Sequence, residues 1–192
     1  MCGRYYIDEA VEKDIERLVR EIDKNMKRQR IGDIHPTETA PVICKREKEL
    51  YAVDMKWGFE GKNRKPLINA RAESALEKPT FSDSVKHRRC IIPARKFYEW
   101  NREKQKVTFL YEKSPSIYMA GFYRMYGTEP HFIILTTAAN NSMKPVHDRM
   151  PLILDEQEIK TWIYEDDKVE EFLRKSSPTL ERQQDYEQMS LF

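Results

Sequence analysis

The sequence predicts a single α+β domain built around a closed or nearly closed antiparallel β core. A chain of 192 residues has the length of one domain. Its second half carries short apolar and aromatic segments at fairly even spacing, separated by polar turns, which is typical of strands in a closed sheet. Residues 8–30 instead place apolar side chains three to four positions apart, as an amphipathic helix does.

The first half predicts one helix, a loop with two prolines and a hairpin. Its expected elements are a helix at 8–30, a loop at 34–41, strands at 42–44 and 50–59, a strand at 67–70 and a helical stretch at 72–78. Asp8 is the expected N-cap of the helix and Gly32 its expected end. The charged residues 45–48 form the expected turn of the hairpin.

The second half predicts strands followed by two helices. The expected elements are strands at 90–93, 97–100, 107–111, 117–123 and 131–138, then helices at 155–164 and about 167–174. Asp155 is the expected N-cap of the first helix, with Glu158 at the capping-box position. Residues 176–188 are polar and contain Pro178, so we predict a domain at 1–175 and a tail without a core of its own at 176–192.

Composition sets limits on the compartment and on cofactors. Lys and Arg number 34 against 32 Asp and Glu, a net charge of +2 that neither requires nor excludes a nucleic-acid partner. No apolar run is long enough to span a membrane and no signal peptide is visible, so a cytoplasmic protein is expected. The three cysteines are unpatterned; Cys44 and Cys90 sit in apolar runs and are expected to be buried. The four histidines lack metal-ligand spacing, and no cofactor is expected.

The N-terminal sequence Met1–Arg4 carries the most distinctive chemistry. Removal of Met1 would leave Cys2 with an α-amine and a thiol on adjacent carbons. This 1,2-aminothiol traps aldehydes: the amine forms a Schiff base and the thiol closes a thiazolidine ring. The two groups titrate at about 7.7–8.0 and about 8.5 in model compounds, which suits covalent catalysis near neutral pH. On the alternative interpretation, Cys2 has no chemical role and is simply the second residue of the chain.

Three further polar clusters lie in apolar surroundings, at residues 69–73, 97–100 and 146–151. Asn69 is a turn or cap residue on one interpretation and a functional amide on the other. Glu99 either faces solvent on an alternating strand or is buried beside aromatic residues, where its carboxyl would suit proton transfer. His147 is either a surface residue or a proton carrier.

Three arginines lie within these motifs, one in the N-terminal sequence and one each in the clusters at 69–73 and 146–151. Arg4, Arg71 and Arg149 are either ordinary surface charges or clamps for phosphate groups, because a guanidinium binds phosphate in bidentate fashion.

Together the motifs closely resemble the SOS-response-associated peptidase (SRAP) family. The matching segments, in order, are Met1–Arg4, Met55–Phe59, Asn69–Ser74, Arg89–Trp100, Ala120–Phe122, Leu135–Asn140 and His147–Pro151. They cover most of the chain up to about residue 154. The sequence departs from the family in a short loop after Phe59 that lacks the usual Pro and Trp, so the groove beside residues 60–65 is expected to differ.

The resemblance implies a compact α+β domain that binds single-stranded DNA containing an abasic site and crosslinks to it. Cys2 would be the nucleophile and Asn69 would orient its amine and thiol. Glu99 would help the abasic sugar open to its aldehyde, and His147 would relay protons.

The same resemblance assigns the DNA contacts. Arg4, Arg71 and Arg149 would hold phosphates, and Trp57 would stack near the lesion. Lyase activity and self-processing at Met1 are also implied. The protein is expected to be a monomer.

The last five residues predict a second partner. Gln188, Met189, Leu191 and Phe192 resemble the short peptide by which bacterial proteins dock on the replicative sliding clamp. Alternatively, these apolar residues fold back on the core or match by chance.

Two other functions remain open from the sequence. An N-terminal-nucleophile cysteine peptidase would use Cys2, Asn69 and His147 on peptide bonds. A non-catalytic single-strand binder would not need the Cys2 thiol. The set of three arginines favours DNA over a peptide substrate.

Overall fold

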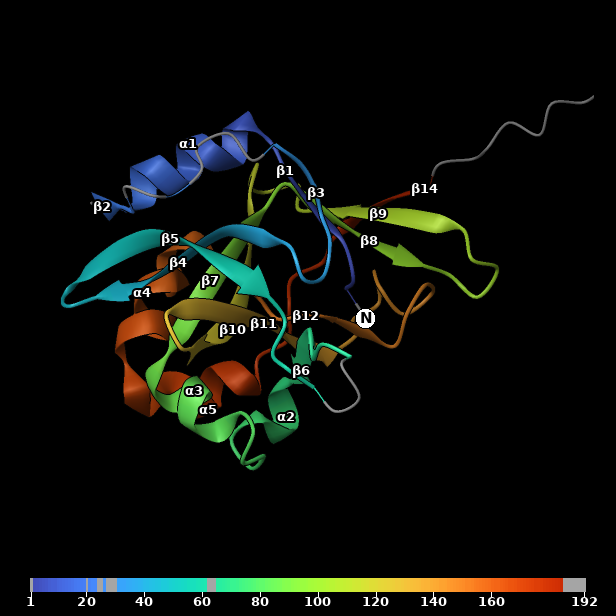
Figure 1. Ribbon diagram of the computed structural model, residues 1–192. Coiled ribbons are helices and arrows are strands. Elements are labelled where there is room, and N and C mark those ends of the chain that lie inside the picture. The colour runs from blue at the N-terminus through green and yellow to red at the C-terminus, as the bar shows by residue number, and fades with distance from the viewer. Residues whose placement is uncertain (1, 20, 24–25, 27–30, 62–64, 185–192) are drawn as a thin grey trace, which may run out of the picture.

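Five strands close into a barrel at the centre of the molecule (Figure 1). In this computed structural model the ring runs through β11 (Glu129–Ala138), β10 (Ile117–Tyr126), β7 (Arg89–Ala94), β4 (Thr39–Arg46) and β5 (Glu49–Trp57). The neighbours are antiparallel except where β5 meets β11 to close the ring in parallel. The predicted α+β fold with a barrel-like core is therefore confirmed.

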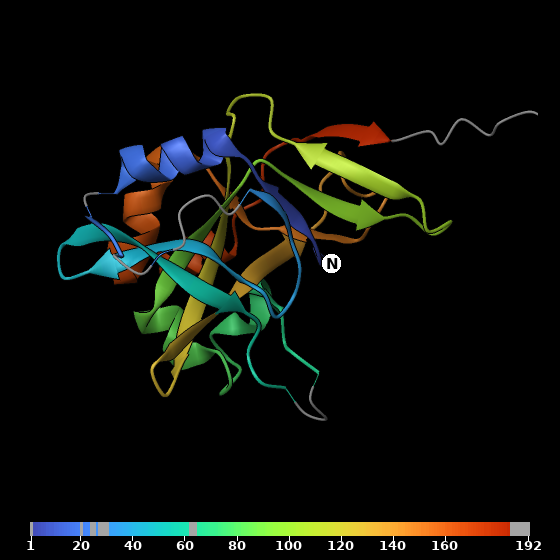
Figure 2. The same cartoon turned by 45° about the horizontal axis from the view of Figure 1, so that its top comes forward.

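A second sheet of five antiparallel strands packs beside the barrel (Figure 2). Its order is β14 (Glu181–Gln184), β9 (Lys106–Leu110), β8 (Lys96–Trp100), β1 (Tyr5–Ile7) and β3 (Gly32–Ile34). Four short strands extend the barrel sheet: β6 (Asn69–Arg71) and β12 (Arg149–Pro151) on β11, β13 (Ile153–Leu154) on β10, and β2 (Glu21–Ile22) on β5. The structure describes residues 2–19, 21–23, 26, 31–61 and 65–184.

Aromatic side chains fill the core between the two sheets. The Trp57 ring lies parallel to Phe132 at 6.1 Å and tilted against Tyr5 at 5.2 Å, and all three side chains are fully buried. A Cβ at Gly121 would come within 2.4 Å of the Ile133 carbonyl oxygen, so this position on β10 needs glycine. Cys44 and Cys90 are buried opposite one another on β4 and β7, which confirms the prediction for both.

Helices cover the barrel on opposite sides (Figure 1). Their bounds are α1 (Glu9–Leu18), α2 (Ala72–Ala75), α3 (Ser82–His87), α4 (Ile159–Tyr164) and α5 (Val169–Leu173), with 3-10 turns η2 (Glu156–Glu158) and η3 (Asp166–Lys168) before the last two. The predicted N-cap is confirmed, since the Asp8 carboxylate accepts a hydrogen bond from the Val11 backbone N–H at 3.0 Å. The capping box at Asp155 and Glu158 is also present.

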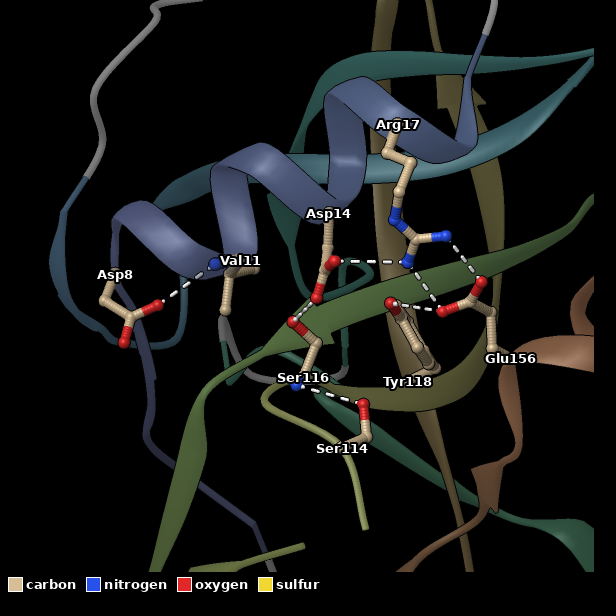
Figure 3. Close-up of polar contacts among 8 residues, drawn as sticks. All are labelled: Asp8, Val11, Asp14, Arg17, Ser114, Ser116, Tyr118 and Glu156. Atoms are coloured by element: carbon tan, nitrogen blue, oxygen red, sulfur yellow. Dashed lines mark hydrogen bonds and ion pairs between the residues drawn. The ribbon is translucent and has the colours of Figure 1, made fainter. Parts of the chain in front are cut away.

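A polar clasp joins α1 to the barrel (Figure 3). Arg17 donates two hydrogen bonds to the Glu156 carboxylate, at 2.7 and 2.6 Å. Next to it, the buried Ser116 hydroxyl donates to Asp14 at 2.6 Å. The clasp therefore connects α1 to the start of β10 through Ser116 and to the η2 turn through Glu156.

The structure differs from the sequence prediction in the first helix. It ends at Leu18 rather than continuing to residue 30, because Val19 adopts an extended backbone. Ile22 continues the apolar spacing but lies in β2, opposite Ala52 of β5. Gly32 is not a helix end: it lies in β3 with a φ of +134°.

The segment after residue 175 also differs from the prediction. Ser177 and Leu180 are buried, and residues 181–184 pair with β9 as strand β14. The Ser177 hydroxyl accepts from the Ile153 N–H at 3.0 Å and donates to the Pro151 carbonyl at 2.7 Å. This segment thus completes the second sheet. The predicted clamp peptide at residues 188–192 lies outside the described residues.

Candidate active site

Strand β6 places Asn69 against the N-terminal segment. The Asn69 amide Nδ2 donates to the Cys2 carbonyl oxygen at 3.0 Å. Asn69 is fixed opposite Ile134 of β11 by the parallel pairing of β6. Its Oδ1 atom is buried and has no hydrogen-bond partner among the described residues. Asn69 does not cap α2, whose N-cap is Arg71.

The Cys2 side chain is fully buried in this structure, in which Met1 still precedes it. Its Sγ lies 3.8 Å from the Arg4 carbonyl oxygen. Burial raises the pKa of the Cys2 thiol well above its usual range, and the negative charge of Glu99 raises it further. The thiol is therefore protonated at neutral pH and needs a base before it reacts as a thiolate.

Glu99 is buried, with 4% of its surface exposed, so the burial expected on the second interpretation is confirmed, whereas proton transfer by Glu99 stays a prediction. In strand β8, Phe97, Tyr98 and Glu99 are buried, whereas Trp100 is exposed. Glu99 lies opposite Val107 of β9 in the second sheet. Glu99 is enclosed by this sheet, and its charge acts on the buried Cys2 thiol.

His147 lies in the segment between β11 and β12, partly exposed, with its backbone N–H bonded to Met143. Its Nδ1 faces both a donor, the Arg149 backbone N–H at 3.0 Å, and an acceptor, the Asp148 carboxylate at 2.9 Å. The neutral ring can accept from Arg149, and the protonated ring can donate to Asp148. Both protonation states therefore have a local partner, as a proton relay requires.

The three predicted phosphate-binding arginines have different surroundings. Arg4 lies 3.6 Å from the Asp33 carboxylate and over the Trp100 ring at 5.2 Å. Arg71 is exposed on β6.

Arg149 is largely enclosed and is held by an acid. It makes a bidentate pair with Glu73 at 2.6 and 2.8 Å and donates to the Thr136 carbonyl at 2.6 Å. The guanidinium lowers the pKa of the Glu73 carboxyl. Glu73 and Thr136 are partners that the sequence did not identify.

The prediction for Trp57 requires a correction. Trp57 is fully buried, and its Nε1 donates to the Ile68 carbonyl at 3.0 Å, so its ring offers no face to a nucleotide base. Trp100 has 37% of its surface exposed and lies under Arg4. Strand periodicity could not have identified Trp100, because Tyr98, on the same face of β8, is buried.

A groove lies beside Trp100 and His147 on the surface. It has a volume of about 620 Å³ and is lined by Trp100, His147 and Lys144, among others. A second hollow of about 630 Å³ is lined by Glu73, Glu77 and Glu170. Three acids against Arg174 line the second hollow, whereas the first has Arg102 and Lys144 against Glu103 and Asp148. The exposed Trp100 ring, on which a base can stack, makes the first the candidate groove for a nucleic-acid strand.

Structural comparison identifies the class of fold. A crystal structure of a protein from Bacteroides thetaiotaomicron superposes with a TM-score of 0.79 at 21% identity, covering 95% of this chain and 91% of that one. A structure from Bordetella bronchiseptica gives a TM-score of 0.78 at 20% identity, covering 95% and 99%. These proteins share the same α+β barrel fold.

The chain belongs to the SOS response associated peptidase (SRAP) family, whose family model matches residues 1–190. It is 32% identical over 181 residues to abasic site processing protein YoaM of Bacillus subtilis (strain 168), covering 85% of this chain and 79% of YoaM. It is 28% identical over 180 residues to abasic site processing protein YedK of Escherichia coli (strain K12), covering 85% and 79%. Abasic site processing protein HMCES of Xenopus tropicalis is 31% identical over 123 residues, covering 50% and 37%.

Two further observations concern the described part of the chain. None of its helices is long and apolar enough to cross a membrane. Its His, Cys, Asp and Glu side chains form no group of three or more that could hold a metal ion.

Proposed function

We propose that this protein processes abasic sites in single-stranded DNA and forms a covalent thiazolidine crosslink through Cys2. The observation that carries the proposal is the Asn69 hydrogen bond to Cys2, next to a buried carboxylate at Glu99. Relatives that are 28–32% identical over 85% of this chain are named abasic site processing proteins, which supports the substrate.

The reaction begins with hydrolysis of the Met1–Cys2 peptide bond, which frees the Cys2 α-amine. Asn69 Oδ1, buried and without a partner among the described residues, can accept a hydrogen bond from that amine. The amine attacks C1′ of the ring-opened sugar, and loss of one water gives an iminium ion. The thiol sulfur then bonds to C1′, the C=N π electrons move to nitrogen, and the thiol proton is lost.

The surrounding residues move the protons. Glu99 takes the proton of the C1′ hydroxyl and passes it to the ring oxygen as the sugar opens to its aldehyde, and it later takes the thiol proton as the C–S bond forms. This base is needed because burial keeps the thiol protonated. His147 relays the protons of Schiff-base formation, including the one with which the hydroxyl on C1′ leaves as water. If a proton is lost from C2′ before the thiol adds, β-elimination cleaves the strand instead, which is a lyase reaction.

The DNA strand lies in the groove between Trp100 and His147 in this proposal. Arg4, Arg71 and Arg149 contact phosphates, with Arg149 positioned by Glu73. Trp100 takes the stacking role predicted for Trp57, because its ring is exposed.

Denaturing gel electrophoresis with intact mass measurement tests the proposal. The protein is mixed with single-stranded DNA that carries one abasic site. We expect a heat-stable band whose mass is that of the DNA plus the protein without Met1, less one water. Cys2→Ala should abolish the band, and the matched variant Cys44→Ala, which removes another buried thiol, should retain it. A processed wild-type protein that gives no covalent species would refute the proposal.

The peptidase activity is proposed as self-processing at the Met1–Cys2 bond, with the Cys2 thiol as the nucleophile. The test is translation in a purified system without methionine aminopeptidase. Loss of Met1 from the wild type and retention in Cys2→Ser would support self-processing. Equal loss of Met1 from both would assign the cleavage to another enzyme, and cleavage of unrelated peptides would favour the alternative N-terminal-nucleophile peptidase.

The C-terminal residues Gln188, Met189, Leu191 and Phe192 are proposed to bind the bacterial sliding clamp, with the apolar side chains in clamp pockets. Surface plasmon resonance with purified clamp, comparing the full chain with a chain ending at residue 187, provides the test. Equal binding by the two chains would exclude this peptide as the docking segment.

A further inference from the structure

The outer face of the second sheet combines cations with aromatic rings. Lys96 Nζ lies 4.9 Å from the centre of the Tyr6 ring and 5.8 Å from that of Tyr98. Lys106 Nζ lies 5.3 Å from the centre of the Tyr98 ring. Tyr6 and Lys96 are direct partners across β1 and β8. These four side chains, which we call the sheet platform, therefore share one face of three adjacent strands.

The sheet platform is continuous with the candidate active site. Lys106 pairs with Trp100 across β8 and β9, and Arg4 covers the Trp100 ring at 5.2 Å. Arg4 in turn is two residues from Cys2. A surface of alternating cations and rings thus extends from Arg4 across β1, β8 and β9, and it meets the groove beside His147 at Trp100, which belongs to both.

The charge of this face is positive. Arg4, Lys96 and Lys106 contribute cations, and the exposed turn between β8 and β9 adds Arg102 and Lys104 against Glu103. Asp33 is the acid on β3 beside Tyr6, and it is engaged by Arg4 at 3.6 Å and by the Tyr98 hydroxyl.

We propose that the sheet platform is a second binding track for single-stranded nucleic acid, which holds the nucleotides on one side of the lesion. Lysines bind the phosphates, and the partly exposed Tyr6 and Trp100 rings stack on bases, the combination by which single strands are bound without sequence preference. Tyr98, which is 5% exposed, supports the two lysines from below. The inference rests on the proposed function for the identity of the lesion, but not for the binding itself.

Fluorescence anisotropy with a double variant, Lys96→Gln with Lys106→Gln, tests the track. The DNA is a long strand with a central tetrahydrofuran, an abasic analogue that has no aldehyde and cannot crosslink. Loss of two phosphate contacts should reduce the slope of log affinity against log salt by about 1.4 and weaken binding roughly tenfold at low salt. The matched control Lys13→Gln with Lys160→Gln, two exposed lysines on α1 and α4, should bind like the wild type.

Shortened strands locate the track. Strands that end at the analogue on its 5′ side or on its 3′ side are compared, and the double variant should bind one of the two as the wild type does. Lys96→Arg with Lys106→Arg should restore binding to the long strand. Wild-type affinity and salt slope in the Gln variant would overturn the inference.

The two proposals fail separately. Crosslinking of true abasic DNA by the wild type, together with undiminished binding by the Gln variant, would refute the binding role of the sheet platform and support the proposed function. Weakened binding by the Gln variant without any crosslinking by the wild type would support the binding role and refute the proposed function.

Discussion

The amide of Asn69 is the side chain most directly placed to orient Cys2, which it holds at 3.0 Å. We expect Asn69→Ala to slow crosslinking about tenfold, since one positioning hydrogen bond is worth about 1.4 kcal/mol at the upper end of the usual range. The measurement is the single-turnover crosslinking rate at saturating DNA, with the melting temperature as a control for folding. A wild-type rate in a folded variant would show that the hydrogen bond has no part in the reaction.

The carboxylate of Glu99 affects Cys2 through its charge. Because that charge raises the pKa of the Cys2 thiol, Glu99→Gln should make the thiol titrate at lower pH. The same variant should crosslink more slowly, because it lacks the base that takes the thiol proton. The rate of Cys2 alkylation by iodoacetamide at pH 8, read by mass spectrometry, measures the first effect through the thiolate fraction, with Cys44 and Cys90 as internal references. Slower alkylation of Cys2 in the folded variant would contradict this electrostatic coupling.

The clasp between α1 and the barrel allows two kinds of polar contact to be compared within one element (Figure 3). Arg17 and Glu156 are both about half exposed, so Arg17→Ala should cost about 1 kcal/mol of unfolding free energy or less. Asp14→Ala removes the acceptor of the fully buried Ser116 hydroxyl and should cost about 1–3 kcal/mol. Urea unfolding of the two variants gives the order.

The control for the clasp is the variant Asp14→Ala with Ser116→Ala. It removes both partners of the buried hydrogen bond and should recover part of the lost stability. If Arg17→Ala were the more destabilising single substitution, the exposed ion pair would be the stronger contact. Crosslinking should be unaffected in all three, since none of these side chains lies in the proposed site.

The segment after α5 contributes to the stability of the fold, which its polar sequence did not indicate. Deletion of residues 176–192 removes strand β14, buried Leu180 and the Ser177 bonds to β12 and β13, and should cost more than about 3 kcal/mol. Deletion of residues 188–192 should leave the melting temperature unchanged. Thermal unfolding of the two truncated chains measures the difference. Equal stability of the two would mean that β14 contributes nothing to the fold.

Local signals in the sequence predicted most elements and missed those that depend on distant partners. The hairpin of β4 and β5, the Asp8 cap and the capping box at Asp155 follow from residues close together in the chain. Strand β14 has a polar sequence and owes its place to β9, more than 70 positions earlier. In the same way Ile22 fits a helical period, yet it pairs with Ala52 of β5.

The candidate site shows the same division. Cys2 and Asn69 were identified from their motifs, but the hydrogen bond between them depends on β6 pairing with β11. Trp57 was misassigned because an apolar ring in a motif does not reveal whether it faces the core or the solvent. Its burial follows from closure of the barrel through β5 and β11.

At the scale of the whole molecule, barrel closure and the second sheet enclose all three cysteines. Cys2, Cys44 and Cys90 are each at most 4% exposed. Burial raises the pKa of the Cys44 thiol to about 12 and that of Cys90 well above its ordinary value, as it does for Cys2. In the unfolded chain the same thiols titrate at about 8.5. Folding therefore keeps protons on three groups that the unfolded chain releases in alkali.

This linkage predicts that stability falls as the pH rises. Folded-state pKa values above the unfolded value give a contribution that is fully present below about pH 8.5 and is lost as the pH rises above it. Each thiol should lower the unfolding free energy by about 0.7 kcal/mol per pH unit at pH 8.5, rising toward about 1.4 kcal/mol per pH unit as the unfolded thiol becomes fully ionised. Urea titrations between pH 8 and pH 9.5 measure the slope. Cys44→Ala should make the slope shallower by one thiol's share, and an unchanged slope would show that Cys44 ionises equally in the folded and unfolded chains.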